Sequence, residues 1–269
     1  MSRRDHELRL FNEIFPTNFD GLLVEVPDWV RCGIGRRLRS GQLTIVSAVC
    51  PDYERRNGKF TYRGLGEGVP FTAEQHLVIM EQVAAILAER GIALSYFMTL
   101  ADTEFDLPLV VESLAGGSSE EFLRRCDGSC EALLRSARER GVPLELSQRF
   151  TEAFPDWFEN YQHALDHMRS EAATSSSASA DLSRSSFSRM PLYRAMAGRQ
   201  VPIDYCREMV LRQWAQYAAW GQSATTRFGP DIIMMNHSTP NLSRVNVPLF
   251  RAGRERIPIL QLSITTMPD

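Results

Sequence analysis

Lysine is almost absent from this chain: Lys59 is the only one, arginine supplies the other cationic residues, and the formal net charge is -3. Such a chain lacks the basic excess of DNA-binding domains, so we expect no DNA partner. No run of 18 apolar residues occurs, so we expect no membrane-spanning helix, and the charged N-terminus leads into no apolar segment of a secretory signal. The five cysteines are scattered and odd in number, which does not indicate a disulfide framework. Together these absences predict a cytoplasmic, reduced protein with no membrane partner.

A dinucleotide fingerprint is also absent. The glycines of Gly64-Leu65-Gly66-Glu67-Gly68 have neither GxGxxG nor Walker spacing, and no helix opens directly after them. The sequence therefore gives no reason to expect a bound cofactor.

The informative stretch runs from Gln42 to Asp106 and reads strand, loop, helix, strand. Residues 43–49 form an apolar, β-branched run of the kind buried in parallel sheets, and the run ends at Cys50-Pro51. A glycine-rich loop follows, then a helix from Thr72 to Gly91, then a second apolar strand over 93–100. This βαβ unit predicts an α/β fold with a Rossmann-like, mostly parallel sheet and helices on both faces.

The rest of the chain adds elements to this unit. We expect an N-terminal arm over 1–41 and a single domain over 42–269, closed by two antiparallel strands near 245–249 and 257–264. Residues 172–188 are rich in serine and offer little to bury, so we expect a flexible insertion there.

Acidic residues follow both strands of the βαβ unit, where open parallel sheets bind ligands. They can bind an amine or act as bases, and Asp102 is the one of them that we select as a candidate catalytic residue. His237 follows a later apolar strand and is the candidate proton-transfer residue, while Lys59 in the glycine-rich loop can bind a phosphate or form a Schiff base. Candidate substrate-binding residues at the same edge are Asp52, Tyr53, Glu54, Glu104, Asn236, Ser238 and Asn241.

Two further sets of residues are candidates for other chemistry, one as nucleophiles and one as metal ligands. Ser47 and Cys50 are candidate nucleophiles at the end of the first strand, although acids beside Cys50 oppose a thiolate. A Cys2His2 zinc site is geometrically possible from two helical i,i+4 pairs, but small core cysteines and surface imidazoles are the preferred explanation of those pairs, so no metal is predicted. The four residues are Cys126, Cys130, His163 and His167.

The order of the βαβ unit, with Lys59, Leu65-Gly66 and Asp102, resembles the isocyanide synthases. The late run Phe228 to Ser238 and then Arg244 to Val247 resembles the same family. The resemblance implies a Rossmann-like enzyme that converts an amino acid's amine to an isonitrile with a phosphosugar, which Lys59 would engage.

A second resemblance is to the cyclodipeptide synthases, Rossmann-like relatives of class I aminoacyl-tRNA synthetases. Ile45-Val46-Ser47-Ala48 looks like their nucleophile strand, and Tyr217 begins a helical run that has Gly221 where theirs has Glu. The order Asn236-His237, Thr239-Pro240 and Arg251-Ala252-Gly253 is similar to their C-terminal end. This resemblance implies acyl transfer from aminoacyl-tRNA, with Ser47, Cys50 or Tyr217 taking part.

The sequence thus favours a biosynthetic transferase or synthase of specialised metabolism that acts on an amino-acid-like substrate. The isonitrile reaction is the first hypothesis and tRNA-dependent acyl transfer the second. A non-catalytic Rossmann-like binding module is the third.

Overall fold

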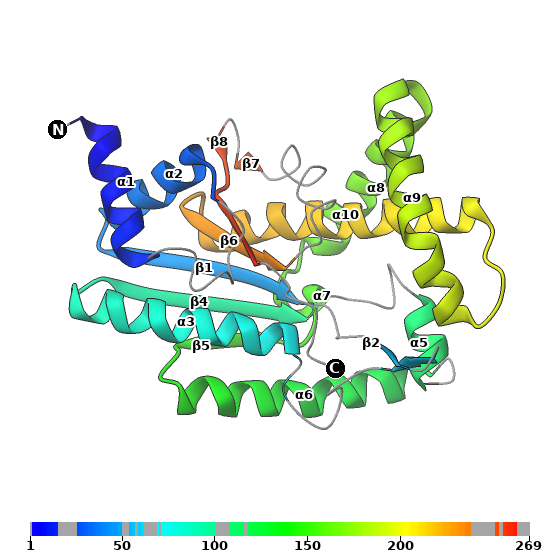
Figure 1. Cartoon of the computed structure of the whole chain (residues 1–269), viewed down its shortest axis with the longest axis horizontal. Helices are drawn as coiled ribbons and strands as arrows, with labels where there is room; N and C mark the ends of the chain where they lie inside the picture. Colours follow the sequence, from blue (N-terminus) through cyan, green and yellow to red (C-terminus); the bar gives the residue numbers. More distant parts are fainter. Residues whose placement is uncertain are drawn as a thin grey trace.

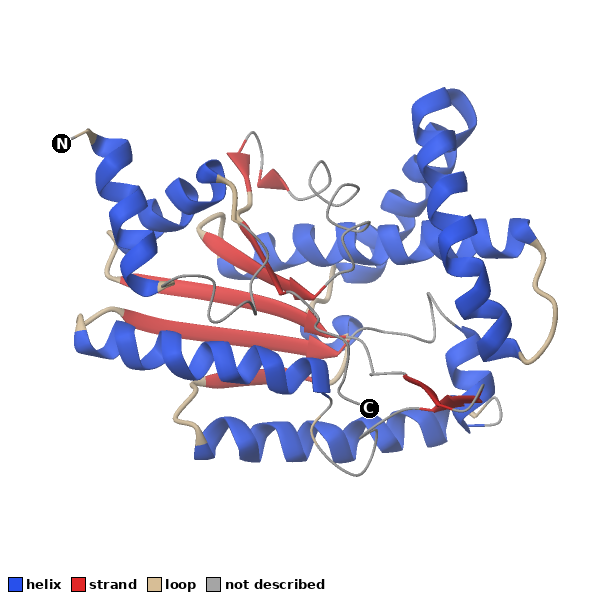
Figure 2. Cartoon of the chain, viewed as in Figure 1, coloured by secondary structure: helices blue, strands red, loops and turns tan. Residues whose placement is uncertain are grey.

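The chain folds around a five-stranded parallel sheet, as a computed structural model shows (Figures 1 and 2). The structure describes residues 2–15, 26–49, 54–56, 59–61, 69, 71–100, 108–115, 118–237, 251–252 and 255–262. The strands are β1 (Gln42–Val49), β4 (Ala93–Leu100), β5 (Leu144–Ser147), β6 (Ile232–His237) and β9 (Ile259–Leu262). Their spatial order is β5-β4-β1-β6-β9. By position in the chain this is third, second, first, fourth, fifth, the order of Rossmann sheets. The predicted α/β, Rossmann-like class is confirmed.

Strands β1 and β4 are buried on both faces, because helices cover the sheet on each side. One face is covered by α3 (Phe71–Glu89), α6 (Ser119–Glu139) and two N-terminal helices, α1 (Arg3–Ile14) and α2 (Asp28–Leu38). The other face is covered by α7 (Phe150–Ala153), α8 (Trp157–Thr174) and α10 (Ile203–Phe228). We call these the α3 face and the α10 face. The alternation of side chains along β1 divides the apolar core between them: Ile45 and Val49 on the first, Val46 and Ala48 on the second.

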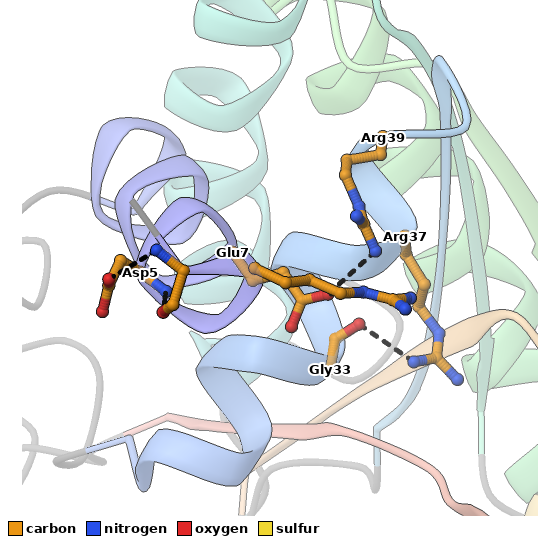
Figure 3. A network of polar contacts seen from close by, with 7 residues as sticks. Asp5, Glu7, Gly33, Arg37 and Arg39 are labelled. Carbon is orange, nitrogen blue, oxygen red and sulfur yellow. Dashed lines mark hydrogen bonds and ion pairs between the residues drawn. The ribbon is translucent and has the colours of Figure 1, made fainter.

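The two N-terminal helices, α1 and α2, pack against each other and against the core of the α3 face. Gly35 lets α2 approach α1 so closely that an added Cβ would lie 2.1 Å from the Glu7 carbonyl oxygen. Arg39 donates a 2.8 Å hydrogen bond to the buried Glu7 carboxylate, and Arg37 donates to the carbonyls of Gly33 (3.0 Å) and Pro230 (2.9 Å) (Figure 3). Because Pro230 lies two residues before the start of β6, Arg37 joins α2 to the sheet.

The serine-rich segment is helical, so the expected flexible insertion over 172–188 is wrong. It forms the end of α8 and much of α9 (Ser176–Ala197), with the Ser175 hydroxyl capping α9 by accepting from the Ala178 N–H. Leu182 and Tyr193 of α9 are buried against its neighbours. The segment is polar on average, but a few apolar residues on one face of α9 pack against the core and stabilise the helix. Average composition does not show how such residues are arranged. Helix α5 (Pro108–Ala115) lies beside α9.

The expected antiparallel closure at the C-terminus is wrong for the described strand. Strand β9 pairs in parallel with β6, in the register Met234 with Ile259 and His237 with Leu262. The expected strand over 245–249 lies outside the described residues. Antiparallel pairing occurs in two short ribbons, β2 (Glu54–Arg56) with β3 (Lys59–Thr61) and β7 (Arg251–Ala252) with β8 (Glu255–Arg256). Among the described helices, none is long and apolar enough to cross a membrane.

Candidate functional site

The order of the strands reverses between β1 and β6, and this switch point defines where a ligand crevice is expected in an open parallel sheet. Ala48, near the carboxyl end of β1, pairs with Asn236 of β6, and His237 is the last residue of β6. Asn236 is only 3% exposed, and its side-chain oxygen Oδ1 accepts no hydrogen bond in the described part of the chain. A buried amide oxygen that accepts no hydrogen bond is unusual in folded proteins. It marks the carboxyl end of β6 as a place where a polar group of a ligand would be stabilised.

A second polar group lies on the α3 face of the same central strand. The Ser47 hydroxyl of β1 is 3.2 Å from Nδ1 of His76, in the second turn of α3. The Tyr96 hydroxyl of β4 is 3.4 Å from the same nitrogen, and Tyr96 also forms a hydrogen bond with Ser47. The three side chains come from three elements and form one hydrogen-bonded cluster, with Ser47 and His76 each 0% exposed.

The chemistry open to the cluster follows from the protonation of its members. Burial raises the pKa of Tyr96 well above its usual range, with its hydrogen-bond contact with Ser47 acting in the opposite direction. Tyr96 is therefore a neutral phenol that can donate a hydrogen bond. In the His76 tautomer with an unprotonated Nδ1, that nitrogen accepts from Ser47, which is the arrangement of a hydroxyl nucleophile and its base.

His76 was missed in the sequence, although a signal for it exists. The apolar face of the helix runs through Ala73, Leu77, Met80 and Val83, and position 76 lies on that face. A histidine on a buried stripe needs polar partners, which can come only from other elements. The strands beneath α3 offered Ser47 and Tyr96, but their register against the helix is not readable from sequence.

Most of the acidic loop residues expected at the edge lie outside the described residues, so their roles stay predictions. The same holds for the candidate nucleophile Cys50, which follows the last residue of β1. Lys59 begins β3 and is paired with Arg56 of β2, in a ribbon where Glu54 is the first residue. The candidates outside the description are Cys50, Asp52, Tyr53, Asp102, Glu104, Ser238 and Asn241.

Two predicted groupings are not brought together. Tyr217 is buried on the α10 face with its ring edge against Trp220, so the sheet separates it from Ser47. Cys126 and Cys130 are buried in the core of the α3 face, whereas His163 and His167 are exposed on α8 across the sheet. Burial, with smaller contributions from nearby acids, raises the pKa of Cys130 to about 12, so its thiol stays protonated. These four residues cannot share one metal ion.

Comparisons with known proteins found likeness at the level of structure only. No protein-family model matches the sequence, and no curated protein matches it. A cyclodipeptide synthase from Staphylococcus haemolyticus matches with a TM-score of 0.44 and 10% identity, over 86% of this chain and 94% of its own. A cyclodipeptide synthase from Bacillus thermoamylovorans matches with a TM-score of 0.46 and 9% identity, over 91% and 96%. At these values the likeness concerns the path of the chain and carries no inference about activity.

The expected resemblance to the isocyanide synthases is wrong. Both of these solved structures are cyclodipeptide synthases, the family of the second sequence resemblance. The order strand, loop, helix, strand suggested the first family, but that order is common to Rossmann-like folds and does not separate one family from another. The phosphosugar partner depended on the isonitrile reaction and is withdrawn with it, whereas the phosphate-binding or Schiff-base role of Lys59 stays a prediction.

Proposed function

We propose that this protein is a biosynthetic acyl transferase that takes an aminoacyl group from aminoacyl-tRNA onto a nucleophile at the carboxyl end of β1. The observation that carries the proposal is the 3.2 Å contact between the Ser47 hydroxyl and His76 Nδ1, on the central strand of the sheet and beside its switch point. A hydroxyl is a weak nucleophile unless an adjacent base removes its proton, and an imidazole at this distance is suited to that role.

In the proposed reaction the Ser47 oxygen attacks the carbonyl carbon of the aminoacyl ester. His76 takes the hydroxyl proton, and the 3′-terminal ribose oxygen of the tRNA leaves with a proton. The amine of a second amino-acid-derived substrate then attacks the enzyme ester, forming an amide and restoring the Ser47 hydroxyl. Atoms and charges balance in both steps, and neither step needs an oxidant or a nucleoside triphosphate.

Cys50 is the competing nucleophile for the same reaction. Ser47 is fully buried in the folded core, so an acyl donor reaches it only if the chain opens beside β1. Cys50 follows β1 directly in the sequence and can form a thioester by the same exchange. If Cys50 is the nucleophile, the cluster of Ser47, His76 and Tyr96 only stabilises the carboxyl end of β1.

The experiment is to incubate the full chain with aminoacyl-tRNA, with deacylated tRNA, or with free amino acid, and to measure the intact mass. An added aminoacyl mass with the first donor alone supports acyl transfer. Both candidates lie in the tryptic peptide spanning residues 40–55. Ser47→Ala and Cys50→Ala therefore decide between them, and a thioester on Cys50 would be released faster by neutral hydroxylamine than an ester on Ser47.

Tyr217→Phe is the matched control, because Tyr217 lies across the sheet from Ser47. If no donor leaves a covalent mass and no dipeptide product forms, acyl transfer is refuted. Ligand binding without turnover would then favour the third hypothesis, a non-catalytic binding module.

A further inference from the structure

Arg189 lies on the buried stripe of α9. The buried residues of this helix are Leu182, Ser186, Tyr193 and Met196, and Arg189 follows Ser186 by three positions and precedes Tyr193 by four. Residues with this spacing share one face of a helix. The side chain therefore starts from the inner face of α9, where an apolar residue would be expected.

That part of α9 crosses the carboxyl end of the sheet. Leu182 packs into the core of the α10 face, whereas Tyr193 and Met196 pack into the core of the α3 face. A helix that joins the two faces must pass beyond an edge of the sheet, and Figure 1 shows α9 beyond the arrowheads of β1 and β4. The β2–β3 ribbon, which follows β1 in the chain, also contacts α9. Arg189 lies at the middle of this crossing.

The charge of Arg189 is not matched by a described acid. The residue is half-buried, its Nη1 is closed to solvent, and it has neither a hydrogen bond nor an ion pair with the parts of the chain that the structure describes. Arg184, on the exposed side of the same helix, pairs with Asp181 at 3.4 Å. A shielded guanidinium without a counter-charge is costly, because a buried charge requires pairing and hydrogen bonding.

A second cation, Arg194, follows Arg189 by five residues and adjoins the buried Tyr193. Arg194 is half-buried, its Nε has no hydrogen-bond partner among the described residues, and no described acid pairs with it. Burial raises the pKa of the Cys206 thiol and the Arg194 charge opposes that rise, which locates Arg194 near the first turn of α10. Helix α9 thus carries two half-buried cations, Arg189 and Arg194, for which the described residues supply no negative charge.

We propose that Arg189 binds an oxyanion of the substrate, a phosphate or a carboxylate, at the carboxyl edge of the sheet. The planar guanidinium fork matches two oxygens of either group, and the partly desolvated setting strengthens such a bond. If the proposed acyl transfer holds, the oxyanion is a phosphodiester near the acceptor end of the tRNA. The site itself does not depend on that reaction, since it is tested without any acyl donor.

The experiment measures thermal unfolding of the full chain against inorganic phosphate and, separately, sodium acetate, at constant ionic strength. We expect phosphate to raise the midpoint of the wild-type chain and Arg189→Met to weaken its binding by about 10- to 100-fold, the loss expected for one charged hydrogen-bonding group. In anion-free buffer Arg189→Met should unfold no earlier than the wild type, because it removes an unmatched charge from an apolar stripe. A response to acetate alone would assign the site to a carboxylate.

Arg184→Met is the matched control, since it removes an exposed arginine from the same helix and should keep the wild-type response to phosphate. Arg189→Lys keeps the charge and loses the fork, so its phosphate affinity should fall between those of wild type and Arg189→Met. The proposal is overturned if neither anion stabilises the wild type. It is also overturned if Arg189→Met keeps the wild-type response to the stabilising anion; if that variant also unfolds earlier than the wild type, a group of the chain itself holds Arg189.

Discussion

Replacing Ser47 with alanine separates the chemistry of its hydroxyl from its contribution to stability. The change removes one oxygen from a fully buried side chain and leaves a methyl group among apolar neighbours. The Tyr96 hydroxyl stays within 3.4 Å of His76 Nδ1, so the imidazole keeps a hydrogen-bond partner. Because a buried hydrogen bond contributes about 0.5–1.5 kcal/mol net, we expect Ser47→Ala to lower the free energy of unfolding by about 1 kcal/mol.

The matched change at the other end of the bond behaves differently. His76→Ala removes a ring from a fully buried position and takes the shared partner from both Ser47 and Tyr96. Core truncations of this size cost about 2–5 kcal/mol, so His76→Ala should be the more damaging of the two. Urea unfolding followed by tryptophan fluorescence measures both. With a slope of about 3 kcal/mol per M, Ser47→Ala should move the midpoint by about 0.3 M.

If Ser47 is the nucleophile, Ser47→Ala should have a large effect on activity although its effect on stability is small. Ser47→Ala should then abolish the covalent aminoacyl adduct at a stability close to that of the wild type, which no purely structural role of the hydroxyl predicts. A loss of about 3 kcal/mol or more in Ser47→Ala would refute the reasoning from the hydrogen-bonded cluster. An undiminished adduct in that variant would remove Ser47 from the mechanism.

Three further predictions concern the fold. Gly35→Ala should destabilise the chain by about 3 kcal/mol in urea unfolding, since its Cβ would meet the backbone oxygen of Glu7 at 2.1 Å and force α1 from α2; an unchanged midpoint would contradict this contact. Arg227→Met should cost about 1–3 kcal/mol in the same assay, because the guanidinium lies 4.7 Å from the ring centre of Phe97 and also donates to a backbone carbonyl, and Arg227→Lys should recover part of the loss. Hydrogen bonds from two neighbouring arginines lower the pKa of Glu121 to about 2, below its ordinary value of 4.5, so its ionised form contributes stability above pH 4.5 that is lost as the pH falls towards 2. Glu121→Gln should therefore lower the thermal midpoint at neutral pH and match the wild type near pH 2; a difference that persists there would refute this assignment.

The sheet was readable from sequence because its strands are buried on both faces. The apolar runs over 43–49 and 93–100 correspond to β1 and β4, and the run at 232–235 lies in β6. The strand at 259–262 was found as well, but its direction was assigned wrongly. A short apolar run indicates burial and does not say which way the chain passes through the sheet. Direction depends on the connection before the strand, which for β9 spans residues 238–258 and includes the β7–β8 ribbon.

The helical character of α9 escaped the sequence for a different reason. Its composition is that of a flexible segment, and its apolar residues are too sparse to define a face until the neighbouring helices are in place. Tertiary contacts with α10, α8 and α5 fix it. Arg189 was hidden in the same way, whereas His76 could be noticed on its apolar helix face but its partners Ser47 and Tyr96 could not be identified from sequence.

Two polar groups with atoms closed to solvent, one on β6 and one on α9, have a common physical meaning. Asn236 Oδ1 on β6 and the Arg189 guanidinium on α9 have no partner among the described residues. Either would be more stable as an apolar residue of similar size, because an unsatisfied buried group carries its desolvation cost alone. A fold that keeps two such groups near one edge, an acceptor and a cation, is not optimised for stability there. The compensating contacts are expected from a molecule that donates a hydrogen bond to Asn236 and presents an oxyanion to Arg189. An aminoacyl ester of a nucleotide has both groups, an amine and a phosphate, whereas a free amine or a free phosphate has only one. Under the proposed acyl transfer, the aminoacyl donor would supply both groups, and the phosphate test on Arg189 checks one of them separately.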